Sequence, residues 1–134
     1  MLVGLGTPLI FAHEASETSA DTAQKPNIAM LLSDQLERVE GTEVIVSKVQ
    51  IPPNMTLPKH WHPGEEFVYV IKGSVTLWQE GKDDVVFAAG DAGKVPLKQV
   101  HTAITGDEGV ELIVFRVHET GQPERVLVGD SEKD

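Results

Sequence analysis

Short runs of β-branched and aromatic residues, separated by glycine, proline and aspartate, dominate the chain from residue 43 onward. The apolar run 27–32 is too short to distinguish helix from strand, but the polar stretch and Gly41 that follow favour a short strand. Further strands are predicted at 43–51, 67–72, 74–79, 85–89, 94–97, 100–105 and 110–117. Many short strands joined by such turns indicate an all-β sandwich or barrel.

The two ends of the chain break this pattern. Met1–Ala12 is apolar but too short to span a membrane. It resembles the apolar core of a secretory signal peptide, but the basic residues that normally precede that core are missing. The alternative is an N-terminal strand that packs on the rest of the domain. We slightly favour a truncated signal peptide. We therefore expect a flexible segment over 1–26, a barrel over 27–128 and a tail over 129–134. The location would be periplasmic or secreted if Met1–Ala12 is a truncated signal peptide, and otherwise cytoplasmic.

Composition narrows the classes of partner. The chain has 134 residues, which is enough for one domain, and a formal net charge of -10 at pH 7. This charge argues against nucleic acid and anionic membranes, which both need a basic surface. The absence of cysteine excludes a disulfide framework, a thiolate zinc site and a cysteine nucleophile.

One stretch, residues 60–73, combines candidate chemistry with a strand. His60 and His62 are two residues apart and Glu66 keeps their parity, so all three side chains can face one point. Two imidazoles and a carboxylate commonly bind a divalent transition metal. His101 lies on a later strand, and in a closed barrel distant strands face the same interior. We therefore expect one divalent ion per chain, of iron, manganese, nickel, copper or zinc, bound by His60, His62, Glu66 and His101.

These residues resemble the two sequence motifs of the cupin family. His60, His62, Glu66 and Gly73 are similar to the first motif, and Gly90, Pro96 and His101 are similar to the second. Asn54, Lys98 and Thr105 depart from the family pattern, which has Gly, Gly and Asn there. Asn54 tolerates the turn conformations that glycine adopts. The resemblance covers roughly 44–117 and implies a double-stranded β-helix, or jelly-roll barrel, with the metal inside. Many relatives of this kind are dimers, so we expect a homodimer in which residues 27–32 reach across to the partner.

Several other polar side chains are interpreted as ordinary. Glu65 has the opposite parity to Glu66 and is expected in solvent, and His118 is expected in an exposed turn. Trp61 and Trp78 are expected to be packing residues. Lys94, Lys98 and Arg116 are expected to be solvated or paired with nearby acids.

Two hypotheses of different classes follow. The first is a metal-dependent enzyme, dioxygenase-like or similar, that acts on a small oxygenated organic molecule, with Glu66 as the ligand able to take a proton. The second is a small-molecule- or metal-binding module without turnover, favoured by the lack of any acid or base beyond the four ligands. Whether the lumen holds a polar pocket or is filled with apolar side chains would help to distinguish them.

Overall fold

The computed structural model describes residues 24–129. The predictions for Met1–Ala12, for the segment up to residue 23 and for the tail from residue 130 lie outside the described residues. Within the described part, no helix has the length and apolar character needed to cross a membrane.

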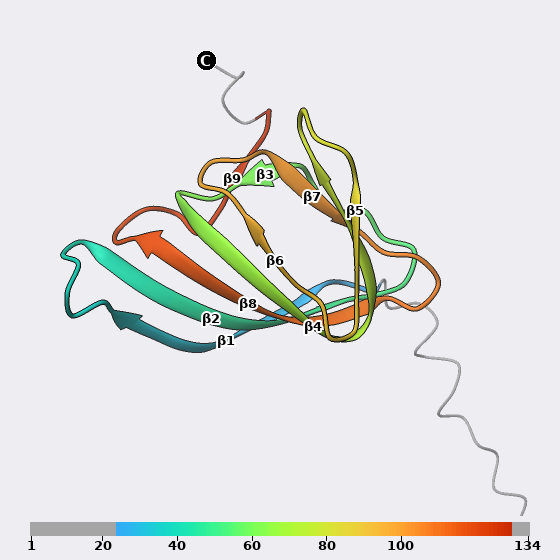
Figure 1. The fold of residues 1–134 in the computed structure, drawn as a ribbon, viewed down its shortest axis with the longest axis horizontal. Helices are drawn as coiled ribbons and strands as arrows, with labels where there is room; N and C mark the ends of the chain where they lie inside the picture. The colour runs from blue at the N-terminus through green and yellow to red at the C-terminus, as the bar shows by residue number, and fades with distance from the viewer. Residues whose placement is uncertain (1–23, 130–134) are drawn as a thin grey trace, which may run out of the picture.

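The described residues form nine strands and no helix, which confirms the all-β prediction (Figure 1). The strands are β1 (Asn27–Gln35), β2 (Thr42–Ile51), β3 (His60–Trp61), β4 (Gly64–Gln79), β5 (Val85–Ala88), β6 (Ala92–Val95), β7 (His101–Ile104), β8 (Val110–Glu119) and β9 (Val126–Leu127). The two-residue strands β3 and β9 were not predicted, because no apolar alternation can be recognised over so short a stretch.

The strands pair in the order β1-β2-β8-β4-β7-β3-β9, with antiparallel neighbours throughout. The first part of β4 pairs with β8 and β6, and its last part pairs with β5 and β7. β4 therefore belongs to both layers of the curled sheet (Figure 1).

The prediction that Gly73 ends one strand and begins another is wrong. β4 runs without a break from Gly64 to Gln79, with an irregularity in register between Val70 and Lys72. Gly73 has a φ of 78°, and a Cβ atom on it would collide with the carbonyl oxygen of Gly109. The glycine therefore lets one strand bend from the first layer into the second.

We expect Gly73→Ala to lower the free energy of unfolding by about 3 kcal/mol, because it adds a backbone collision to the cost of a positive φ. Gly81→Ala is the matched control, since Gly81 has a φ of 77° but nothing within 4 Å of its Cβ position. That variant should cost only about 1–2 kcal/mol. Urea denaturation measures both, and equal losses would contradict this role of Gly73.

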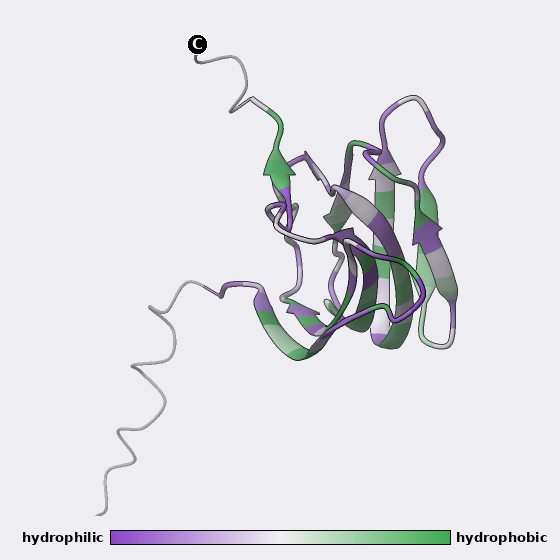
Figure 2. Cartoon of the chain, turned by 90° about the vertical axis from the view of Figure 1, so that its left-hand side faces the viewer, coloured by the Kyte–Doolittle hydropathy of each residue, from purple (hydrophilic) through white to green (hydrophobic). Residues whose placement is uncertain are grey.

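Buried and less buried positions alternate along strands such as β2 and β8, and hydrophobic and hydrophilic bands follow one another along the strands in Figure 2. The core contains buried Val49, Ile51, Val70, Val110, Leu112 and Val114. Along β8, the buried positions change from Val110, Leu112 and Val114 to Arg116 and His118. The interior is thus apolar toward one end and polar toward the other.

Candidate metal centre

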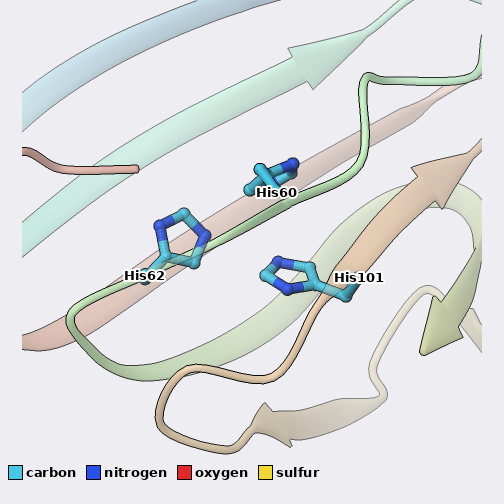
Figure 3. A group of neighbouring side chains, drawn as sticks. All are labelled: His60, His62 and His101. Atoms are coloured by element: carbon cyan, nitrogen blue, oxygen red, sulfur yellow. The ribbon is translucent and has the colours of Figure 1, made fainter. Parts of the chain in front are cut away.

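Three histidines from two neighbouring strands and the loop after β3 meet at the polar end of the interior. His60 of β3 pairs directly with His101 of β7, and His62 follows two residues after His60. Their ring centroids lie 4.4–5.0 Å apart, and all three side chains are buried. Figure 3 shows the rings gathered around one point. The predicted convergence of His60, His62 and His101 is therefore seen in the structure.

Each of these rings is held by a backbone carbonyl. The Nδ1 atoms of His60, His62 and His101 lie 2.7, 2.6 and 2.8 Å from the carbonyl oxygens of Pro58, Glu124 and Gln99, respectively. A carbonyl oxygen can only accept, so each Nδ1 carries a proton and donates it. This leaves Nε2 of each neutral ring as a free electron-pair donor, and outer hydrogen bonds of this kind orient the histidines of metal sites.

The arrangement fits a metal ion. One nitrogen from each ring can be chosen so that all three lie within 4.8 Å of one another. Ligands of a single ion, each about 2.0–2.1 Å from it, are roughly 3–4 Å apart. Three buried imidazoles, whose tautomers are fixed by hydrogen bonds to backbone carbonyls, could therefore hold a transition metal.

The environment of His60 and His101 favours their neutral form, which metal binding requires. Burial lowers the pKa of His60 from 6.5 to about 4, although its hydrogen bond to the carbonyl of Pro58 acts in the opposite direction. Burial also lowers the pKa of His101, against a similar hydrogen bond to Gln99. The nitrogens of these two rings are therefore available to a metal at lower pH than those of a free imidazole.

The lowered pKa of His60 predicts that the metal-free protein loses stability as the pH falls from 6.5 toward 4. In this window the unfolded chain binds a proton at this histidine and the folded chain does not, so protonation favours unfolding. The full stability is present above pH 6.5. We expect a loss of about 2 kcal/mol from this residue between pH 7 and pH 5. Urea denaturation of wild type and His60→Asn at both pH values checks it, and an identical pH dependence in the two proteins would contradict it.

Glu66 lies beside the three histidines but outside their group. Its Oε2 atom is 2.7 Å from Nε2 of His62 and 3.0 Å from Nε of Arg116, which donates a hydrogen bond to it. Burial alone would raise the pKa of Glu66, but the close contact with His62 and the charge of Arg116 outweigh burial and lower that pKa to about 2. Glu66 is therefore an ionised carboxylate at the edge of the cluster.

The contact between His62 and Glu66 implies a cation. Nε2 of His62 is buried and lacks a hydrogen-bond partner within the described residues, because its proton is on Nδ1. A bare imidazole nitrogen and a carboxylate oxygen both carry lone pairs, and 2.7 Å is too close for two acceptors. A proton between the two atoms, or a metal ion bound to Nε2 of His62, would relieve the repulsion.

The structure corrects the expectation for His118 and refines that for Arg116. His118 is not in an exposed turn; it is almost fully buried, and its Nε2 donates to the carbonyl oxygen of Gln122 at 3.0 Å. Arg116 is paired with an acid as expected, but inside the barrel. Both residues continue the inward alternation of β8, and this periodicity is the signal in the sequence that could have placed them.

The remaining polar residues lie outside the cluster. Glu65 is on the outer face of β4 and forms an ion pair with Lys94. Lys59 lies 4.1 Å from the ring centre of Trp78, and Trp61 is half-buried. Neither tryptophan lines the cavity described below.

The three residues that differ from the cupin motif pattern have conformations or hydrogen bonds that fit their loops. Asn54 and Lys98 replace glycine and still have positive φ values, of 55° and 58°. Thr105 donates to the carbonyl oxygen of Pro52 at 2.6 Å and accepts from the backbone nitrogen of Met55 at 2.9 Å. It therefore ties the loop before the histidine pair to the end of β7.

A cavity of about 90 Å³ opens from the three histidines into the barrel. Its charged lining residues are Glu66, Arg116 and Arg125, and most of the other side chains are apolar. The apolar walls include Val49, Leu57, Val75, Leu77, Val95 and Ala103. The lumen is thus not filled by apolar side chains, and it is not polar throughout. It has a polar end, with the histidines and the charged residues, and an apolar remainder.

A family profile described as Cupin domain matches residues 47–116. The chain therefore belongs to the cupin family, which confirms the resemblance found in the sequence. No curated protein matches this sequence.

Solved structures with this fold include three similar chains. A DMSP lyase from Ruegeria pomeroyi DSS-3 is 20% identical with a TM-score of 0.66, and the match covers 89% of this chain and 59% of that one. A cupin-like protein from Thermotoga maritima is 24% identical with a TM-score of 0.64, covering 78% and 76%. An RmlC-like cupin with a double-stranded β-helix from Methanocaldococcus jannaschii is 18% identical with a TM-score of 0.59, covering 74% and 85%. These likenesses show the fold, a double-stranded β-helix, and this chain spans about three fifths of the length of the lyase.

Proposed function

We propose that this cupin is a metal-dependent enzyme, dioxygenase-like or similar, that acts on a small oxygenated organic molecule. The observation that supports it is the group of three buried imidazoles, each with its Nδ1 bound to a backbone carbonyl and its Nε2 free, in the lining of a mostly apolar cavity. His60, His62 and His101 would hold the metal, and Glu66 would serve as a fourth ligand or as a proton acceptor beside it.

A divalent metal bound here would supply Lewis-acid chemistry or, with a redox-active ion, electron transfer. The protein's own residues would do the rest. The apolar walls would bind the carbon skeleton of the substrate and exclude water. The ionised carboxylate of Glu66, next to His62, would accept a proton from the substrate or from water.

The size of the cavity limits the substrate. At about 90 Å³ it is well below the roughly 300 Å³ at the lower end of drug-sized pockets, so the compartment suits a molecule of few heavy atoms. Other proteins of this fold include a DMSP lyase, a polyketide cyclase and an oxalate decarboxylase. They support action on a small organic molecule without selecting the reaction.

A binding module without turnover is the second candidate. The observation that favours it is that, among the described residues that line the cavity, Glu66 is the only acid. Such a module would retain the metal and bind a small molecule, but would not convert it.

The two candidates are distinguished by loading the protein separately with iron, manganese, nickel, copper and zinc. Oxygen uptake and substrate loss are then measured against small catechols, enediols and keto acids, with flavonols included as compounds that exceed the size of the cavity. Turnover that is lost in Glu66→Gln supports the enzyme. Binding of a compound without turnover for every metal would replace the enzyme with the binding module.

We also propose that the chain forms a homodimer. An apolar row crosses the outside of the sheet, where Val46 pairs with Phe115 and Phe115 pairs with Phe67. Leu32 of β1 lies beside Val46 and is also exposed. The predicted contact segment 27–32 thus extends an exposed apolar surface that a second copy would cover. A monomer mass by light scattering at high concentration would remove this proposal.

A further inference from the structure

We propose that Arg116 is a positioning residue that holds the Glu66 carboxylate outside the metal shell. The metal would then have three protein ligands, all imidazoles, instead of four. This inference rests on the proposed metal site. It assigns a role to Arg116, which is not one of the cupin motif residues and takes no part in the chemistry proposed above.

The first support is the placement of the pair in the sheet. Glu66 on β4 and Arg116 on β8 are direct cross-strand partners, and both point into the barrel. Each residue is only 8% exposed, and Nε of Arg116 lies 3.0 Å from Oε2 of Glu66. Such a charge-assisted hydrogen bond is strong where water is excluded.

The second support is the geometry of the histidine group. Two ligands on opposite sides of one ion are about 4.2 Å apart when each bond is about 2.1 Å. One nitrogen from each of His60, His62 and His101 can be chosen so that the three atoms lie within 4.8 Å of one another. Glu66 is not part of this group. The histidine contact of its carboxylate is with one ring of the group, since its Oε2 atom lies 2.7 Å from Nε2 of His62.

The third support is the cost of moving Glu66 onto the metal. If the carboxylate moved away from Arg116, the buried guanidinium would lose its ion pair with Glu66 and would remain close to a divalent cation. Two buried positive charges repel each other strongly at short range. The Arg116 side chain therefore favours the position of Glu66 seen in the structure, and an additional coordination position stays open for substrate or water.

The test uses full-length protein loaded with Co²⁺, whose visible absorption spectrum depends on its ligands. The variants are Arg116→Met, Arg116→Lys, the double variant Glu66→Gln/Arg116→Met, and the control Lys94→Met. The control removes the exposed Glu65–Lys94 ion pair from the outer face of the same sheet. Cobalt affinity is measured by chelator competition, and circular dichroism verifies folding. The double variant removes both buried charges together, so it remains informative if Arg116→Met does not fold.

We expect the double variant, Arg116→Lys and the control to keep the wild-type spectrum and to bind Co²⁺ within roughly tenfold of wild type. Arg116→Met releases Glu66, so its spectrum should change as a carboxylate joins the metal, and its affinity should rise by roughly tenfold or more. A double variant that loses the wild-type spectrum would show that Glu66 is already a ligand and would overturn the inference, as would a folded Arg116→Met with the wild-type spectrum. Failure of wild type to bind cobalt at all would instead overturn the proposed metal site.

Discussion

Replacing His62 with alanine is expected to abolish most metal binding. His62 contributes one of only three imidazoles in the group, and its Nε2 is the nitrogen that faces both the cluster and Glu66. Loss of an outer hydrogen-bond partner of a metal ligand costs roughly 10–100-fold in affinity, so the loss of a ligand itself should cost more. Elemental analysis of protein purified without added metal, followed by chelator competition, measures the effect.

The matched control is His118→Gln, because His118 is another buried histidine but lies outside the three-histidine group. This variant should keep the wild-type metal content, even if it is less stable. Full metal occupancy in His62→Ala, or equal losses in both variants, would mean that the ligands are wrongly assigned.

Ala103→Leu is expected to block the cavity and to leave the metal in place. Ala103 lies on β7 two residues after His101 and lines the cavity without contributing a polar group. A larger apolar side chain there would occupy part of the roughly 90 Å³ open to a ligand. Because the added side chain competes with the ligand for this space, small-molecule affinity should fall by roughly tenfold or more, which is about 1.4 kcal/mol or more of binding free energy.

The measurement is the binding or turnover of the best compound from the metal-loaded panel, together with metal content. Ala88→Leu is the control, since Ala88 on β5 is exposed and does not line the cavity. Unchanged binding in Ala103→Leu would place the substrate elsewhere. Loss of metal in a folded Ala103→Leu would show that the cavity and the cluster cannot be separated in this way.

The fold could be predicted because its signals are local. Alternating apolar positions and turn residues located most strands, and the spacing of His60, His62 and His101 indicated that they converge. The continuity of β4 through Gly73 could not be predicted, because glycine marks the end of a strand and a bend within one equally well. Only the position of Gly109 beside it distinguishes the two.

The convergence of the three histidines could be predicted from the sequence, whereas the electrostatics of the candidate site could not. Glu66 has the parity of a ligand, yet its observed neighbour is a cation fifty residues later in the sequence. That pairing depends on the register between β4 and β8, which is set by the whole barrel and leaves no trace near residue 66. His118 was placed in solvent for a related reason, since the inward alternation of β8 continues four residues beyond Val114, its last apolar side chain on that face, through Arg116 to His118.

The central claim is that three imidazoles of this barrel hold one divalent metal ion. X-ray absorption at the metal edge, on protein purified without added metal and quantified by elemental analysis, tests it most directly. We predict about one transition-metal ion per chain, with three nitrogen neighbours of the imidazole type at about 2.0–2.2 Å. The claim would be contradicted if the protein held no stoichiometric metal either as purified or after incubation with the divalent ions named above. A metal surrounded by oxygen atoms alone would also contradict it.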